Sequence, residues 1–175
     1  MAVVETWDAI RARRNVRTYE DRPIAAAELD RILEAGRLTP SSTNWQPWDF
    51  VLVTERDRLK HLAKVWQGAA HIASSAATIA LVGPVLADDD FRRDWVPYDL
   101  GQATMSMLLA AADLGIGSGH GYVYDQALAR QLLGLPDDKF CAYLIGFGYP
   151  SDRPLTPLKR PNRRAFEDVV HRDRW

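Results

Sequence analysis

Five residues near the start of the chain, Arg13-Arg14-Asn15-Val16-Arg17, place three arginines on a short stretch. A guanidinium presents a planar fork of donors that matches a phosphate, and lysine cannot reproduce that geometry. The asparagine between the arginines adds a short hydrogen-bonding side chain. The cluster predicts an anion site, although three solvent-facing arginines at a helix end would show the same pattern.

A second polar segment follows at Pro40-Ser41-Ser42-Thr43-Asn44-Trp45-Gln46-Pro47-Trp48. Its prolines keep it out of a helix or a central strand, and its hydroxyl and amide groups can bind the polar edge of a flat heterocycle. Ordinary loop and cap residues have the same composition, and the two tryptophans would also serve as core anchors. Together with the arginine cluster, the segment indicates a phosphate-bearing, ring-bearing ligand. Flavin mononucleotide (FMN) has both features.

These segments resemble the nitroreductase family of FMN-dependent oxidoreductases, which begins with Arg-Arg-Ser-x-Arg and continues with Pro-Ser-x-x-Asn-x-Gln-Pro-Trp. Asn15 stands where the family usually has serine. Two later segments resemble the family in the same order. Asp99-Leu100-Gly101-Gln102 leads into an apolar stretch and Gly115-Ile116-Gly117-Ser118, and Gly146-Phe147-Gly148-Tyr149-Pro150 precedes a basic tail. The resemblance covers almost the whole chain.

The resemblance implies an FMN site that needs no catalytic side chain and no metal. The cofactor-binding residues that it implies are Arg13, Arg14, Asn15, Arg17, Pro40, Ser41, Ser42, Asn44, Gln46, Gln102, Gly121, Arg163 and Arg164. Lys159 and Arg160 are basic neighbours of the last two, and a basic tail is also typical of a solvated chain end. Gln102 could equally be a water-exposed residue at a helix N-terminus. In the family, some polar loop groups come from the partner subunit of a homodimer.

The activity implied by the resemblance is hydride transfer from NAD(P)H through bound FMN to a nitroaromatic, a quinone or a related acceptor. A specialised relative, such as a reductive dehalogenase, a flavin-cleaving enzyme or a metabolite dehydrogenase, would need a lid, and Pro84 to Pro97 is the only candidate segment. A non-catalytic flavin-binding or phosphate-binding module would result if Trp45, Trp66 or Trp95 filled the substrate space. These alternatives remain open at this point.

Composition limits the other classes. The chain has 175 residues, 47% of them apolar, and a net charge of −1, which predicts one folded domain over residues 1–175 and no nucleic-acid-binding surface. Cys141 is alone and the four histidines are scattered, so neither a disulfide nor a metal site is expected. The longest apolar stretch, Ala76 to Ala87, is too short to cross a membrane, and Glu5 and Asp8 stand where a signal peptide would be basic and then apolar. A cytoplasmic protein is expected.

The order of predicted elements favours an α+β fold, with a central mixed, mainly antiparallel sheet flanked by helices. A first helix should end at the arginine cluster. We expect further helices over residues 26–37, 56–64, 98–114 and 123–133, and strands over 48–53, 77–82 and 140–147. The first strand should be buried on both faces. The helix over 98–114 is apolar around most of its circumference, so part of its cover should come from a second chain.

Two segments of the chain are not predicted to be part of the core. Gly115, Gly117, Gly119 and Gly121 alternate but lack the G-x-G-x-x-G spacing of a dinucleotide-binding loop. We interpret them as a tight turn that lets backbone approach the flavin, with His120 and Tyr122 bordering the substrate space. The segment from Pro154 onward has no place in the core of its own chain, and in the family the corresponding extension reaches across an intertwined homodimer.

Overall fold

The computed structural model describes residues 5–159 and 161–175, and its centre is a four-stranded sheet. The strands are β1 (Asp49–Val53), β2 (Ala77–Pro84), β3 (Gly117–Tyr122) and β4 (Lys139–Gly148), in the order β1-β2-β4-β3. All three strand pairs are antiparallel. An isolated parallel bridge between Asn15 and Ser118 adds the N-terminal segment beside β3. The predicted α+β fold with a mainly antiparallel sheet is confirmed.

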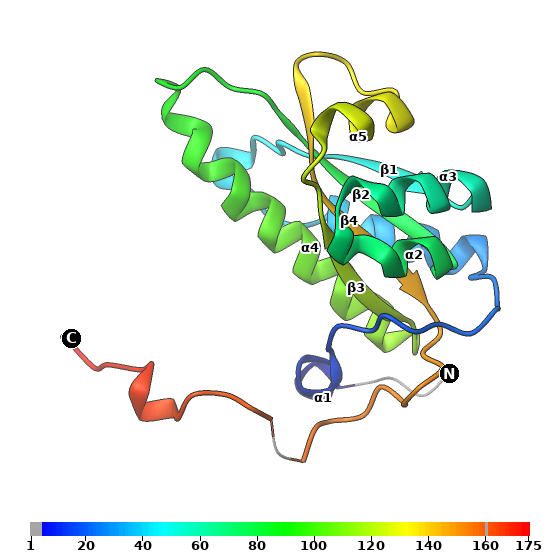
Figure 1. The fold of residues 1–175 in the computed structure, drawn as a ribbon. Helices are drawn as coiled ribbons and strands as arrows, with labels where there is room; N and C mark the ends of the chain where they lie inside the picture. Colours follow the sequence, from blue (N-terminus) through cyan, green and yellow to red (C-terminus); the bar gives the residue numbers. More distant parts are fainter. Residues whose placement is uncertain (1–4, 160) are drawn as a thin grey trace.

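Helices cover both faces of the sheet (Figure 1). The α-helices are α1 (Thr6–Ala12), α2 (Ala26–Arg37), α3 (Arg56–Leu62), α4 (Trp95–Asp113) and α5 (Gln126–Leu133). Short 3-10 helices lie at η1 (Ser42–Asn44), η2 (Ala63–Val65), η3 (Gln67–Ser74), η4 (Phe91–Asp94) and η5 (Phe166–Asp168). Helices α2 and α4 pack on one face, and α3, η3 and α5 pack on the other.

Strand β2 separates two hydrophobic clusters because successive side chains of a strand point to opposite faces. Ile79 and Leu81 belong to the cluster with Met107 of α4, whereas Ala80 belongs to the cluster with Leu59 of α3. β2 is therefore buried on both faces, as its continuous apolar sequence indicates. Because β2 is paired on both sides, it forms a rigid base for the face of the sheet that α4 covers.

The prediction that the first strand is buried on both faces is wrong. β1 lies at an edge of the sheet and pairs only with β2. Its Asp49 and Leu52 are exposed, and Val53 is its fully buried residue. Aromatic and β-branched composition favours a strand but does not distinguish an edge strand from a central one.

The interpretation of the glycine run as a tight turn is also wrong for most of its length. Gly115, at φ +73°, ends α4, and the chain enters β3 at Gly117. A Cβ at Gly119 would lie 2.3 Å from the backbone oxygen of Val16. Glycine is therefore needed here for close approach of the N-terminal segment to β3.

Helix α4 buries one face and leaves an apolar stripe open. Ala103, Met107 and Ala111 are buried against the sheet side, but Tyr98 is 66% exposed and Met105 is 44% exposed. The expected helix is confirmed, beginning three residues earlier than predicted. Its open stripe is what the apolar sequence predicts for a helix whose cover is incomplete within one chain.

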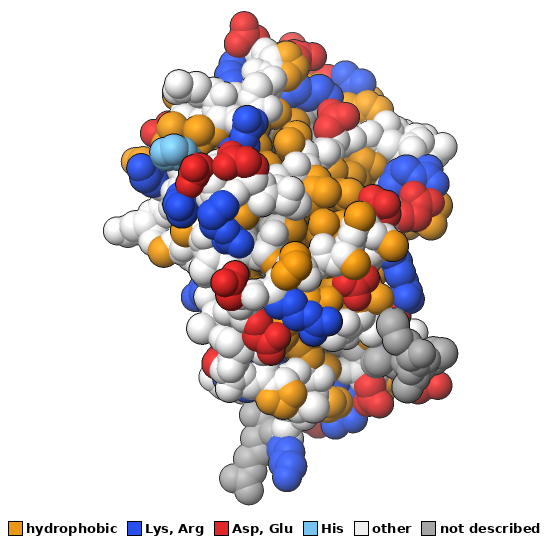
Figure 2. Space-filling model, turned by 90° about the vertical axis from the view of Figure 1, so that its right-hand side faces the viewer, with side chains coloured by type: hydrophobic (Ala, Val, Ile, Leu, Met, Phe, Trp, Pro, Cys, Tyr) orange, Lys and Arg blue, Asp and Glu red, His pale blue; other side chains and the backbone are white. Residues whose placement is uncertain are grey.

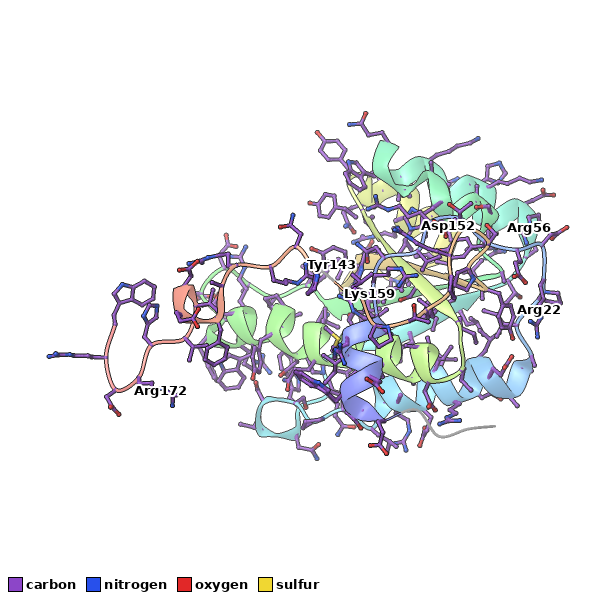
Figure 3. All side chains as sticks on the ribbon, turned by 90° about the horizontal axis from the view of Figure 1, so that it is seen from below. Arg22, Arg56, Tyr143, Asp152, Lys159 and Arg172 are labelled. Atoms are coloured by element: carbon purple, nitrogen blue, oxygen red, sulfur yellow. The ribbon has the colours of Figure 1, made fainter. Side chains whose placement is uncertain are left out.

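The C-terminal tail contacts the folded body as far as Thr156, whose oxygen accepts from Arg14, and its end stands away from the body (Figure 1). Its described residues from 158 onward are exposed, so the prediction that this segment has no place in its own core is confirmed for them. Figure 3 shows Arg172 on the part of the tail that stands clear of the body. Figure 2 shows a face on which basic and acidic side chains are interspersed, in keeping with the small net charge.

Candidate functional site

A pocket of about 610 Å³ lies between α4 and the sheet. This volume falls within the range of small-molecule sites. Leu81 and Ala142 contribute from the sheet, Leu100 and Met105 from α4, and the remaining lining residues are Arg13, Pro97, Gly101, Thr104, Leu108, His120, Tyr122, Phe140 and Tyr143. The walls are mostly apolar, and a cation and an imidazole stand among them. The pocket suits a flat ligand that carries a negative charge.

The segment after α1 places its arginines beside this pocket. The helix ends at Ala12, and the chain then runs extended along β3, where the Val16 N–H donates to the Ser118 oxygen at 2.8 Å. The Tyr19 hydroxyl is 2.8 Å from the Val16 oxygen and 3.1 Å from the Gly146 oxygen, which ties the segment to β4. The backbone that carries the arginine cluster is thus fixed at both ends.

Two cations of the predicted site, Arg13 and Arg163, interact electrostatically, and a third, Arg17, acts on the same histidine as Arg13. Burial lowers the pKa of Arg13, and Arg163 from the tail lowers it further. Arg17 is within electrostatic reach of both His71 and His120, whose pKa values it lowers. Within the described chain, no carboxylate forms an ion pair with any of these three arginines. Gathered cations without a counter-charge are the donor set that a phosphate needs.

Arg14 and Arg164 have different partners from those expected. Arg14 donates to the backbone oxygens of Arg153, Pro154 and Thr156, so it anchors the start of the tail. Arg164 donates to the Asp168 oxygen within the tail. Lys159 is exposed (Figure 3), and Arg160 lies outside the described residues. Of the predicted basic residues, Arg163 lies near Arg13, and Arg13 and Arg17 both lie near His120.

Asn15 contacts the pocket lining through a histidine. Its side-chain oxygen is 3.1 Å from Nδ1 of His120. His120 and Tyr122 project from β3 into the pocket, as expected for residues that border a ligand space. Gly121 lies between them, and a Cβ there would face Ala69 and Ile72 on the opposite side of the sheet. The structure therefore brings Asn15 to the pocket but turns the open side of Gly121 away from it.

The predicted polar loop is ordered around Asp99 at the N-terminal end of α4. The buried carboxylate of Asp99 accepts hydrogen bonds from the Ser42 N–H and hydroxyl, each at 3.1 Å, and a longer one from Gln102 at 3.4 Å. Ser41 Oγ accepts from the Gln46 N–H at 2.8 Å. Pro40, which opens the loop, is exposed. Asp99 was not predicted as a site residue, although it lies three residues before Gln102, in a segment that resembles the family.

The backbone of this loop is strained. Thr43, Asn44 and Gln46 have φ values of 54°, 58° and 54°, in the left-handed region that non-glycine residues rarely adopt. Such conformations persist where surrounding contacts hold them, and they are concentrated at binding sites. Asn44 and Gln46 are exposed, so the loop presents its amides to solvent in a fixed arrangement.

Among the described residues, no hydrogen bond or shared pocket joins the loop to the arginines. The loop bonds to Asp99, whereas Arg13 and Arg14 share a smaller pocket with Ala112 at the other end of α4. At 1.5 Å per residue these positions on the helix are about 20 Å apart. No loop residue from 40 to 47 is among those that line the large pocket. The sequence predicted both halves of the site but not their separation.

An aromatic row at the pocket mouth was only partly anticipated. Tyr122 and Tyr143 are cross-strand partners with ring centroids 6.1 Å apart, and Trp66 packs edge-on against Tyr122. Trp66 therefore supports the wall, and it is not itself a lining residue of the pocket. Tyr143 carries no sequence motif, and only the pairing of β3 with β4 places it beside Tyr122.

Two other kinds of site are absent from the described part of the chain. No group of three or more histidine, cysteine or acidic side chains there could hold a metal ion. Cys141 is a buried core residue, and its burial raises the pKa of the thiol to about 12. No helix among the described residues is both long and apolar enough to span a membrane.

The fold and the pocket together define an α+β domain with a mostly apolar pocket that Arg13 and His120 also line. The model of the nitroreductase family matches residues 10–83 and 69–149. An Archaeoglobus fulgidus protein with the provisional name NADH dehydrogenase/NAD(P)H nitroreductase is 34% identical over 176 residues, which cover 98% of this chain and 99% of that protein. The chain therefore belongs to the nitroreductase family.

Two further relatives place it within this family. A Bacillus subtilis protein named FMN reductase [NAD(P)H] is 26% identical over 98% of this chain and 74% of its own length. The structure of NADPH:FMN oxidoreductase from Vibrio harveyi in complex with NAD+ matches with a TM-score of 0.85 and 25% identity, over 97% of this chain and 77% of that one.

Proposed function

We propose that the protein is an FMN-dependent NAD(P)H oxidoreductase that reduces nitroaromatics, quinones or related acceptors. One observation carries the proposal: Arg13 lines the pocket between α4 and the sheet, and among the described residues no carboxylate pairs with it, with the nearby Arg163, or with Arg17 beside His120. The names of the Bacillus and Vibrio relatives support FMN as the ligand that this group serves. We take residues 1–175 as one FMN-binding domain.

The residues present fit such a cofactor. Arg13, Arg17 and Arg163 would hold the phosphate through charge-assisted hydrogen bonds. Leu81, Ala142 and the α4 wall would exclude water from the ring. When bound, FMN supplies the hydride chemistry itself, so the chain needs to orient the ring and to hold positive charge near it.

We infer that the working unit is a homodimer in which the polar loop completes the site of the other subunit. The open apolar stripe at Tyr98 and Met105 supports this arrangement, because a contiguous exposed apolar surface on a helix is typical of an interface. The separation of the loop from the arginines along α4 supports it as well. The exposed tail, with Phe166 63% and Trp175 98% exposed, would find its cover on the partner.

The alternative of a specialised relative with a substrate-recognising lid is less favoured. The charged residues of the candidate lid pair with one another, Arg93 with Asp88 at 2.5 Å and Arg92 with Asp90 at 2.6 Å. Arg92 also lies over the Trp45 ring at 4.8 Å. These charges are used locally, which supports an open site and a broad range of acceptors.

The alternative of a non-catalytic module predicts that a tryptophan fills the pocket. Trp45, Trp66 and Trp95 are not among the lining residues of the pocket. Trp45 lies under Arg92, and Trp95 packs edge-on against Phe91 at 5.1 Å. The space is thus free of the side chains that would have obstructed a ring.

The visible absorption spectrum of the purified protein tests the proposal. A flavin spectrum that bleaches anaerobically when NADPH or NADH is added, and recovers with a quinone or nitroaromatic, is the expected result. A flavin spectrum that neither donor bleaches would favour the non-catalytic module. A colourless protein that takes up no added FMN would mean that the arginines serve another anion.

A further inference from the structure

We propose that His120 takes up a proton when the phosphate-bearing ligand binds, and so becomes an additional positive group of the site. The proposal rests on the proposed FMN site and adds to it an ionisable residue that holds a proton at a defined atom. His120 combines three properties that no other histidine of the described chain shares. It lines the pocket, it contacts the arginine segment, and it is surrounded by cations.

The contact with Asn15 fixes which nitrogen is involved. The amide oxygen of Asn15 is 3.1 Å from Nδ1 of His120 and can only accept, so the network assigns the hydrogen of the neutral ring to Nδ1. Nε2 is then the atom that binds and releases a proton. Asn15 is anchored in turn by its bridge to Ser118, so the ring is held at a set orientation on β3.

The surroundings of His120 disfavour its protonated form when no anion is bound. Burial lowers its pKa most, and the positive charges of Arg13, His71 and Arg17 lower it further. Arg163 stands beside Arg13, and Tyr143 packs edge-on against the imidazole with ring centroids 6.4 Å apart. Within the described residues, no carboxylate contributes to the pKa of His120. The charges around it are thus all of one sign.

A bound phosphate reverses this balance. Its charge of about −1.5 to −2 at neutral pH would offset the arginines that now disfavour the imidazolium. The pKa of His120 then rises, and binding is accompanied by uptake of a proton at pH values between the pKa of the free protein and that of the complex. By linkage, the contribution of His120 to binding strengthens as the pH falls through this window, so the affinity advantage of the wild type over a variant without this histidine should grow.

The titration of the phosphate has the opposite effect on the number of protons taken up on binding. Its second pKa is about 6, so binding of the dianion at the arginines releases a proton from the fraction that is protonated in solution. Comparison of the wild type with the variant His120→Gln removes this contribution, because both proteins bind the same ligand. Glutamine keeps a polar side chain of similar reach but cannot carry the charge.

Isothermal titration calorimetry measures the proton count directly. FMN is titrated into the flavin-depleted full-length protein at pH 6.5 in two buffers of different ionisation enthalpy, for the wild type, H120Q and H61Q. His61 is an exposed histidine on α3 and serves as the matched control. We expect the wild type and H61Q to take up more protons than H120Q, by up to about one per FMN bound. Equal counts in all three proteins would overturn the proposal.

Nuclear magnetic resonance of the histidine nitrogens gives a second readout that does not depend on the variant being well folded. In the wild type, the pKa of His120 should rise on addition of FMN, and to a smaller extent with inorganic phosphate alone, with Nδ1 protonated throughout. A pKa that is unchanged by FMN would overturn the proposal. Absence of FMN binding would instead contradict the proposed function, so the two failures are distinguishable.

Discussion

Arg13 and Arg17 illustrate how the same side chain takes different roles a few positions apart. Arg11, on α1, pairs with Asp8 at 3.5 Å, and Arg14 binds tail carbonyls. Arg13 and Arg17 have neither kind of partner among the described residues and lie beside a pocket or its histidines. Cations held without a counter-charge raise the free energy of the empty site, and an anionic ligand relieves that cost.

The double variant R13A/R17A should therefore lose FMN and keep its fold. Each charge-assisted contact contributes about 1.5 to 3 kcal/mol, so each substitution should raise the Kd for FMN by at least about tenfold. Flavin retained after dilution and gel filtration measures the effect. The variant R11A, which removes one arginine from the adjacent helix α1, should retain FMN. Full flavin occupancy in the double variant would contradict the phosphate assignment.

His71 predicts a pH dependence of stability. It is buried beneath β3, with Nε2 3.1 Å from the Gly119 oxygen, and burial lowers its pKa below the ordinary value of 6.5. The unfolded chain binds this proton more readily than the folded chain. The contribution of His71 to the free energy of unfolding should therefore be fully present above about pH 6.5. It should be lost as the pH falls from about 6.5 through the lowered pKa.

Urea unfolding at pH 7.5 and 5.5 checks this prediction. The loss of stability between these pH values should be smaller in H71Q than in the wild type, and unchanged in H61Q, because His61 is exposed. His120 is expected to contribute a loss of the same sign, which would persist in H71Q. If H71Q kept the whole wild-type pH dependence of stability, the pKa of His71 would have to be the same in the folded and the unfolded chain.

At the scale of elements, the join between the N-terminal segment and β3 positions the arginines. The variant Gly119→Ala would place a Cβ 2.3 Å from the Val16 oxygen and push the two segments apart. We expect a loss of about 1 to 3 kcal/mol in the free energy of unfolding, with weaker FMN binding. Gly101→Ala, in α4 with no atom within 4 Å of the added Cβ, should instead gain up to about 1 kcal/mol. Chemical denaturation of both variants distinguishes close approach from a general sensitivity to added methyl groups.

Asp99 joins a second pair of elements, α4 and the polar loop. Removal of its carboxylate in Asp99→Ala leaves the Ser42 N–H and hydroxyl without their acceptor, at a cost of about 1 to 3 kcal/mol. The loop should lose its fixed form, and FMN affinity should fall although the arginines are intact. The variant D89A, at an exposed acidic position, is the control. An undiminished FMN affinity in D99A would mean that the loop takes no part in binding.

At the scale of the whole molecule, the exposed stripe of α4 predicts the state of assembly. Sedimentation or light scattering should find a dimer, and Tyr98→Glu, at a residue of the stripe that does not line the pocket, should shift it toward the monomer because a buried, unpaired charge is costly. Leu52→Glu, at an exposed apolar residue on the edge strand β1, should leave the dimer intact. A monomeric wild type with full FMN occupancy would show that one chain suffices for the site.

How much could be predicted from the sequence differs by element. Helical spacing was sufficient for α2, whose bounds Ala26 and Arg37 were predicted correctly, because periodicity and flanking signals are local. The burial of β1 and the role of the glycines in β3 were predicted wrongly. Both depend on which strands are neighbours, and that order is set by contacts between residues far apart in the chain.

The sequence by itself determined the family, the α+β class and the presence of an arginine cluster with a polar loop, because these are carried by short segments and their order. Only the tertiary structure decided which arginines are free. It engaged Arg14 with the tail, set Arg13 near Arg163, and placed Asn15 and Arg17 near His120. The physical reason is that a charge is available to a ligand only when no nearby group satisfies it, and the nearby groups are fixed by packing.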